Sequence, residues 1–321
     1  MINFHKDVLR IDVEKETEKI SRFIQEQTFF LRRDGAIIGL SGGIDSAVCA
    51  ELCVRALEKE RVFGLILPEK ESSPLSKEFA LKQAKKMGII YEVVDITPTL
   101  KAFGTYEKRD RIVKKIFPDY DSNCKLKLTL PPDLLTNDAL NFYTLSIKNS
   151  EGEIKRARLK KDELNGIIAA TNSKQRARMM HLYFYAEKKN FFVCGTTNRT
   201  EIIQGFFVKH GDGGVDVEPI AHLYKMQVYQ LAEYLGVIDE ILSRTPSPDT
   251  YSFEVSDEEF FYRLPYSRLD LLLYAWENNI PLHEVCQVME LKEEQVLRAF
   301  RDFKAKSNAT RHLRMMPPSL L

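Results

Sequence analysis

The feature that most constrains the fold is a six-residue turn, Ser-Gly-Gly-Ile-Asp-Ser at residues 41–46, between an apolar strand and a helix. Residues 36–40, Ala-Ile-Ile-Gly-Leu, have the length and apolar character of a buried strand. Residues 47–57 place apolar side chains at helical spacing. A strand that leads directly into a helix is the building unit of a parallel sheet covered by helices. The turn therefore predicts an α/β fold.

The order of strand and helix repeats along the chain. Further strands are predicted at 61–67, 89–96 and 191–194, and further helices at 12–33, 76–87 and 171–188. The predicted strands are apolar runs, as expected for parallel strands that are buried on both faces. We therefore expect a doubly wound, mostly parallel sheet with helices on both sides.

Residues 97–165 interrupt this alternation and are predicted to be an insertion. Two alternating stretches, 144–147 and 154–159, flank a turn at 149–152, and this pattern predicts a β-hairpin. The second arm is basic, with Lys155, Arg156, Arg158, Lys160 and Lys161. These charges can protect a sheet edge or contact a phosphate or a partner, and the sequence leaves both interpretations open.

The predicted organisation is an α/β domain at residues 1–250, which contains the insertion, and a helical extension at residues 251–321. Residues 282–303 have the pattern of a helix-turn-helix. Glu293 and Glu294 open its second helix, where paired carboxylates would repel nucleic-acid phosphates. The formal net charge of +1 also provides no field for a polyanion. Packing between helices is the preferred interpretation, and no nucleic-acid partner is expected.

The sequence contains no sign of a membrane segment. No stretch approaches about 18 consecutive apolar residues, and the first residues lack a basic head followed by an apolar run. The five cysteines are scattered, odd in number and without the spacing of a zinc site. Reduced thiols are typical of the cytoplasm. We therefore expect a cytoplasmic protein that contacts no membrane.

The turn at 41–46 has the chemistry of a phosphate-binding site. A helix N-terminus offers unpaired amides and a partial positive charge, and the two glycines allow the backbone to approach an anion. The two serines add hydroxyl donors. The turn lacks the lysine of a Walker A loop, and Asp45 beside a phosphate is reasonable if Mg²⁺ lies between them.

Ser-Gly-Gly-x-Asp-Ser resembles the signature of the PP-loop ATP pyrophosphatases, which cleave ATP between the α and β phosphates and form an adenylated intermediate. Further segments narrow the resemblance to ammonia-dependent NAD synthetases. They are Asn-Ser-Lys-Gln-Arg-Ala-Arg-Met at 172–179, Gly-Thr-Thr-Asn-Arg-Thr-Glu at 195–201, Gly-Phe-Phe-Val-Lys-His-Gly-Asp-Gly-Gly-Val-Asp at 205–216, Leu-Tyr-Lys at 223–225 and Pro-Ser-Pro-Asp at 246–249.

The resemblance implies an adenine nucleotide alpha hydrolase-like fold and a ligase. ATP would adenylate the nicotinate carboxylate of deamido-NAD, and ammonia would then form NAD, with release of AMP and pyrophosphate. A PP-loop ligase that amidates a different carboxylate is the alternative. No glutaminase nucleophile or preceding domain is visible, so nitrogen is expected from free ammonia or a separate donor protein. The family also implies a homodimer.

The resemblance implies roles for individual residues. The ATP-binding residues would be Gly39, Leu40, Ser41, Gly42, Gly43, Ile44, Asp45, Ser46, Thr196, Lys225 and Ser247. The substrate-binding residues would be Arg176, Lys209, Asp216, Asp249 and His312. Asp45 and Glu201 would hold Mg²⁺, and the catalytic residues would be Asp45, Ser46 and Lys225. Leu313 stands where the family has a lysine.

Overall fold

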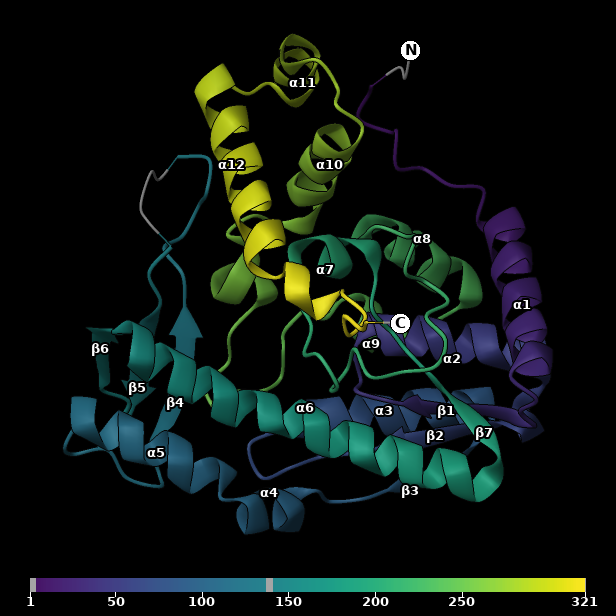
Figure 1. The fold of residues 1–321 in the computed structure, drawn as a ribbon, viewed down its shortest axis with the longest axis horizontal. Helices are drawn as coiled ribbons and strands as arrows, with labels where there is room; N and C mark the ends of the chain where they lie inside the picture. Colours follow the sequence, from purple (N-terminus) through teal and green to yellow (C-terminus); the bar gives the residue numbers. More distant parts are fainter. Residues whose placement is uncertain (1–3, 137–140, 321) are drawn as a thin grey trace.

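The computed structural model describes residues 4–136 and 141–320 (Figure 1). The predicted domain limits at residues 1 and 321, and residues 137–140 of the predicted insertion, lie outside the described residues. A parallel sheet is formed by β1 (Gly35–Gly39), β2 (Val62–Ile66), β3 (Ile90–Val93) and β7 (Phe191–Cys194), in the order β3-β2-β1-β7.

Helices cover both faces of this sheet, which confirms the predicted doubly wound arrangement (Figure 1). On one face, the apolar core contains side chains of α1 (Val13–Phe30), α2 (Ile44–Leu57), α3 (Pro74–Met87), α8 (Lys225–Leu235) and α9 (Asp239–Leu242). On the other face, Ile37 and Val193 pack against α6 (Lys161–Lys189). Strands β1, β2 and β7 are therefore buried on both sides, as their apolar sequences predict, whereas the edge strand β3 is largely exposed.

The order of the strands creates a topological switch point. The chain proceeds from β1 to β2 and β3, and then returns to place β7 on the opposite side of β1. The connections that leave the carboxyl ends of β1 and β7 diverge at this point, which is where open α/β sheets bind ligands. The turn at 41–46 follows β1, and Thr196 follows β7.

The insertion is larger than the predicted hairpin. The hairpin itself is present as β5 (Thr144–Lys148) and β6 (Ile154–Arg158), and β4 (Lys125–Thr129) pairs with β5 to complete a second, antiparallel sheet. Two helices, α4 (Thr97–Phe103) and α5 (Thr105–Ile116), precede it. Alternating Leu126 and Leu128 face a separate apolar core under α5, which explains why β4 forms despite its short, lysine-rich sequence.

The C-terminal part is helical, as predicted, and comprises α10 (Tyr266–Glu277), α11 (Leu282–Met289) and α12 (Glu293–Ala309). The last two helices and the turn between them match the predicted helix-turn-helix, and they pack on each other. The remaining helices are α7 (Arg199–Gln204), η1 (Lys59–Arg61), η2 (Glu258–Tyr262) and η3 (Arg311–Leu313). None of the described helices is long and apolar enough to cross a membrane.

The apolar core of the C-terminal helices also contains Phe4, Leu9 and Leu134 from earlier parts of the chain. The helices are therefore packed onto the α/β part (Figure 1). The predicted domain boundary at residue 250 stays a prediction.

Candidate active site

A cavity of about 510 Å³ lies at the switch point between β1 and β7. Its walls come from the turn after β1, the ends of β2 and β7, the middle of α6, and residues 205–212 and 244–251. The lining includes most of the predicted site residues, namely Gly39, Leu40, Ser41, Gly43, Ile44, Asp45, Arg176, Thr196, Glu201, Lys209, Lys225, Ser247 and Asp249. Among the described residues, four predicted ones lie outside the lining: Gly42, Ser46, Asp216 and His312.

The turn after β1 leads into α2 earlier than predicted. The helix begins at Ile44, so Asp45 and Ser46 lie in its first turn, where a carboxylate is favoured by the helix dipole. Gly43 is the N-cap residue, and no side-chain hydrogen bond caps the start of the described helix α2. The first backbone amides of α2 therefore have no side-chain acceptor at the cap and are available to an anion.

Ser46 acts within the turn. Its Oγ donates to the carbonyl oxygen of Gly43 at 2.9 Å and accepts from the backbone N–H of Ser41 at 3.3 Å. Gly42 has a φ of 74°, and a Cβ atom there would lie 2.2 Å from the carbonyl oxygen of Ser76. Only glycine fits this position, so both residues shape the turn from behind the cavity wall.

Lys225 and Asp45 form the polar centre of the cavity. Lys225 is almost fully buried, and its Nζ donates to Oδ2 of Asp45 at 2.5 Å. The other carboxylate oxygen of Asp45 accepts from the side-chain amide of Asn198 at 3.0 Å. The backbone N–H of Lys225 donates to the hydroxyl of Thr200, which fixes the start of α8 beside α7.

Two more acidic residues, Glu201 and Asp257, interact electrostatically with Lys225. Burial and the charge of Asp45 raise the pKa of Glu201 well above its usual value. Burial likewise raises the pKa of Asp257 to about 6, although Lys225 opposes this shift. Burial disfavours the charge of Lys225 itself, but the nearby carboxylates of Asp45, Glu201 and Asp257 raise its pKa above the ordinary value. Lys225 is therefore a cation at neutral pH within an acidic cluster.

Local sequence explains how Glu201 is positioned. Asn198 caps α7 by accepting from the backbone N–H of Glu201 at 3.1 Å, and Glu201 accepts from the backbone N–H of Asn198 at 3.0 Å. This reciprocal capping box has a recognisable spacing, Asn-x-x-Glu. The same Asn198 holds Asp45, so it connects the two predicted metal ligands, a role that was not predicted.

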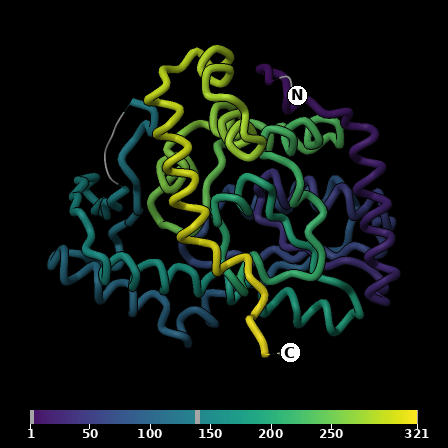
Figure 2. The backbone as a smooth tube through the Cα atoms, turned by 45° about the horizontal axis from the view of Figure 1, so that its top comes forward, coloured from purple at the N-terminus to yellow at the C-terminus, as the bar shows by residue number. Residues whose placement is uncertain are grey.

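Two of the predicted substrate residues, Lys209 and His312, lie together beside the C-terminal segment, which Figure 2 shows leaving the end of α12. Nζ of Lys209 donates to the carbonyl oxygens of His312 and Met315 at 3.0 and 3.2 Å. Leu313 lines the cavity with an apolar side chain. Asp216 instead accepts from the hydroxyl of Tyr183 at 3.0 Å and lies exposed outside the lining.

Two arginines in the lining had no predicted role. Arg244 donates to the carbonyl oxygen of Gly42 and to the hydroxyl of Ser76, so it supports the phosphate-binding turn. Arg178 donates to the carbonyl oxygen of Leu67 at the end of β2. Arg178 belongs to the family-like segment at 172–179, so the sequence could have identified it as a site residue. Arg244 follows α9, and no local sequence pattern identifies it.

The charged side chains of the hairpin's basic arm do not line the cavity, although the backbone N–H of Leu159 in this arm donates to the carbonyl oxygen of Tyr143, which does. Strand β6 is at the edge of the described antiparallel sheet, and Arg156, Arg158 and Lys160 are absent from the described lining of the cavity. The guanidinium of Arg158 instead lies over the ring of Phe142. Of the two interpretations left open by the sequence, protection of a sheet edge agrees with the structure.

Comparisons with known proteins extend over almost the whole chain. A model of the NAD synthase family matches residues 16–125 and 116–317. The NH3-dependent NAD(+) synthetase of Rhizobium meliloti (strain 1021) is 43% identical over 314 residues, which are 98% of this chain and 94% of that protein. The NH3-dependent NAD synthetase structure from Campylobacter jejuni has a TM-score of 0.64 and 25% identity, covering 97% of this chain and 100% of that one. The NMN synthetase structure from Francisella tularensis has a TM-score of 0.67 at 22% identity, covering 96% and 98%, and is similar in fold.

Proposed function

This chain belongs to the NAD synthase family, and we propose that it uses ATP and ammonia to convert deamido-NAD into NAD, with release of AMP and pyrophosphate. It is accordingly a ligase that forms a carbon–nitrogen bond. The observation that carries most weight is the cavity at the switch point. There the phosphate-binding turn, a buried lysine and the carboxylates of Asp45 and Glu201 meet, as activation of a carboxylate by ATP requires.

In the first step, an oxygen of the nicotinate carboxylate attacks the α-phosphorus of ATP. The bond from that phosphorus to the bridging oxygen breaks, and pyrophosphate leaves with the electron pair. The amides at the start of α2 and the ammonium of Lys225 oppose the negative charge that develops on pyrophosphate. Because its pKa is raised, Lys225 keeps this charge throughout the neutral range.

In the second step, neutral ammonia attacks the carbonyl carbon of the acyl-adenylate. The carbon–oxygen bond to AMP breaks, and the nitrogen loses one proton to give the amide. Ammonium has no free electron pair, so the rate depends on the unprotonated fraction. Free ammonia or a separate donor protein as the nitrogen source stays a prediction.

Mg²⁺ is the metal that suits this site. Asp45 and Glu201 both line the cavity, and the negative charge of Asp45 raises the pKa of Glu201, a repulsion that a cation would relieve. No group of three or more His, Cys, Asp and Glu residues in the described chain could hold a metal without help. Mg²⁺ is commonly held by one or two carboxylates together with substrate phosphates. When bound, it would neutralise charge on the pyrophosphate.

A second copy of the chain is the proposed partner. Met180 and Phe184 are 54% and 59% exposed and lie one turn apart on the same face of α6. This apolar face adjoins the exposed Arg176, a predicted substrate residue on the same helix. Replacing Phe184 with aspartate is expected to convert a dimer into a monomer in light scattering, and an unchanged mass would contradict this interface.

The cytoplasmic location also stays a prediction.

The function is tested by incubating the purified chain with ATP, Mg²⁺, ammonium and deamido-NAD. NAD, AMP and pyrophosphate are expected in equal amounts. Turnover should stop when deamido-NAD or ammonium is omitted, although the first step can still release one pyrophosphate per site without ammonium. The mononucleotide of nicotinate serves as a competing acceptor. If AMP forms with that acceptor and not with deamido-NAD, the alternative of a different carboxylate is correct.

A further inference from the structure

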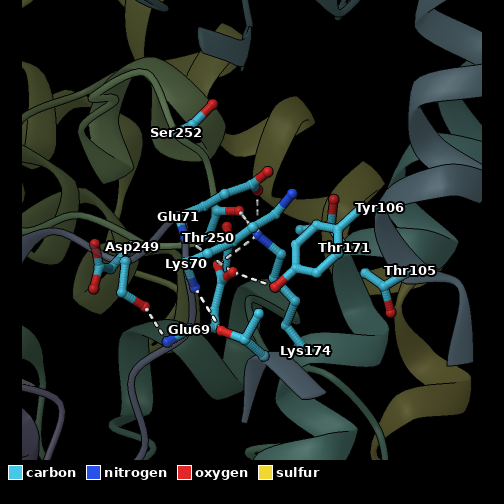
Figure 3. Close-up of polar contacts among 12 residues, drawn as sticks. Glu69, Lys70, Glu71, Thr105, Tyr106, Thr171, Lys174, Asp249, Thr250 and Ser252 are labelled. Carbon is cyan, nitrogen blue, oxygen red and sulfur yellow. Dashed lines mark hydrogen bonds and ion pairs between the residues drawn. The ribbon is translucent and has the colours of Figure 1, made fainter. Parts of the chain in front are cut away.

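Lys174 lies outside the cavity lining and has no part in the proposed chemistry, yet it is the centre of a buried charged cluster (Figure 3). Only 1% of its surface is exposed. Its Nζ donates to Oε1 of Glu69, to Oε2 of Glu71 and to the carbonyl oxygen of Thr250, each at 2.8 Å. An ammonium has three hydrogens to donate, so these three acceptors use all of them.

The acceptors belong to two segments that are distant in sequence. The two glutamates lie in the β2 loop, residues 68–73, and Thr250 lies in the segment 246–257. Both segments line the cavity, the β2 loop through Ser72 and the segment 246–257 through Ser247, a predicted ATP ligand. Lys174 therefore connects two parts of the cavity wall from behind.

The insertion holds the β2 loop from the other side. Arg109 of α5 forms a two-pronged ion pair with Glu71, with N–O distances of 2.6 and 2.8 Å. Tyr106 of α5 donates to Glu69 at 2.6 Å (Figure 3). Burial opposes ionisation of Glu71, but the hydrogen bond from Arg109 and the charges of Lys174 and Arg109 lower its pKa to about 2. The carboxylate is thus charged at any pH at which the protein works, and it needs both cations.

The insertion also supports the segment 246–257. The backbone N–H of Leu126 in β4 donates to the hydroxyl of Ser252 at 3.0 Å, and its carbonyl oxygen accepts from the backbone N–H of Phe253 at 3.1 Å. A direct contact between the two segments completes the arrangement, because the backbone N–H of Ser73 donates to Asp249 at 3.1 Å.

We propose that Lys174 is a positioning residue that fastens the β2 loop to the segment 246–257 and keeps the wall of the ATP site closed, with α5 and β4 as its support. This inference rests on the proposed function only in taking ATP as the nucleotide. Without the ammonium, two carboxylates would lie buried side by side and the Thr250 carbonyl would lose its donor. The segments would separate, and ATP binding would have to bring them together again.

Lys174→Met is the direct test, with the dissociation constant measured for α,β-methylene-ATP, whose bridge resists cleavage, in the presence of Mg²⁺. We expect the dissociation constant and the KM for ATP to rise about tenfold or more, because only a fraction of the molecules keeps the wall closed. The KM for ammonium should stay unchanged, and amide hydrogen exchange in residues 246–257 should accelerate. Binding of the analogue at wild-type strength would overturn the proposal.

Two further variants separate positioning from stability. Lys174→Met with Glu69→Gln removes the uncompensated charge but still provides no donor to Thr250, so thermal stability should recover while the dissociation constant stays raised. If thermal stability and the dissociation constant both recover, Lys174 only neutralises the charge of the glutamates, and the proposal is overturned. Lys306→Met is the matched control. Lys306 is also largely buried and donates to a carboxylate, Asp302, and to the carbonyl oxygen of Phe261, which lines the cavity but belongs to neither of the two segments held by Lys174. This variant should lose stability and bind the analogue normally.

A milder change covers the possibility that Lys174→Met does not fold. Tyr106→Phe removes only the hydrogen bond to Glu69 and should raise the dissociation constant by about threefold, in line with one lost hydrogen bond. An unchanged constant would count against the proposal. Binding of the analogue needs no acceptor carboxylate, so a chain that binds it as expected but makes no NAD would refute the proposed function and leave this inference intact.

Discussion

Replacing Lys225 with methionine is expected to remove the charge at the centre of the cavity while keeping most of the side-chain volume. Nζ of Lys225 lies 2.5 Å from Asp45, and Glu201 and Asp257 also contribute to its raised pKa. Removing one partner of a buried ion pair costs about 3–5 kcal/mol of folding free energy. Carboxyl groups can take up protons in place of the lost cation, so the cost should depend on pH.

The sign of this dependence follows from Asp257. Its folded-state pKa of about 6 is higher than the usual value, so the folded state binds more protons than the unfolded state between the two pKa values. Stability therefore falls as pH rises through this window. Without Lys225 the folded-state pKa of Asp257 rises further, and the window extends upward. The variant should lose least stability near pH 5 and most near pH 8, measured by urea unfolding.

The kinetic effect should be of about the same size as the effect on folding. Lys225 opposes charge on pyrophosphate, and loss of one such group costs about 3–4 kcal/mol, or about 10²–10³ in kcat. The assay is pyrophosphate release at saturating ATP and deamido-NAD, under conditions in which the variant is folded. Lys306→Met, which removes another largely buried lysine, should keep kcat. If Lys225→Met retains kcat within about threefold, the lysine does not stabilise the leaving group.

Three more expectations follow from the site. Asp45→Asn should abolish pyrophosphate release with the fold retained in circular dichroism, and near-normal turnover at limiting Mg²⁺ would exclude Asp45 as a metal ligand. Turnover at fixed total ammonium should rise with pH as ammonia increases, and efficient use of glutamine by the chain alone would contradict this. Replacing Arg156, Arg158 and Lys160 with serine should leave both Michaelis constants unchanged at low salt, and a raised acceptor constant would restore the phosphate-contact interpretation.

Local patterns account for the parts of the site that the sequence predicts. The turn after β1 is closed by hydrogen bonds among Ser41, Gly43 and Ser46, all within six residues. The local sequence is therefore enough to predict its shape. Glu201 is held by a capping box of equally short range. The parallel sheet follows from strand-length apolar runs alternating with helices, and the hairpin from a turn between alternating segments.

Long-range contacts account for what could not be predicted. Lys174 is separated from its glutamate partners by 105 and 103 residues, and none of these partners stands in a recognisable spacing. The raised pKa of Asp257 depends on burial, and Lys225, which opposes this shift, is distant from Asp257 in sequence. Strand β4 was missed because its polar alternation has meaning only beside β5 and the core under α5.

The two sides of the cavity are consequently stabilised in different ways. The phosphate side consists of backbone amides and short hydrogen bonds at 41–46. Arg244, Asn198 and Lys225 support it from distant parts of the chain. The opposite side depends on Lys174 and on contacts with α5 and β4. A chain could therefore hold pyrophosphate on the first side while the second is open. If the second side closes as proposed for Lys174, it would add contacts to the rest of the nucleotide, and α5 and β4 supply the charges and backbone contacts that favour the closed arrangement.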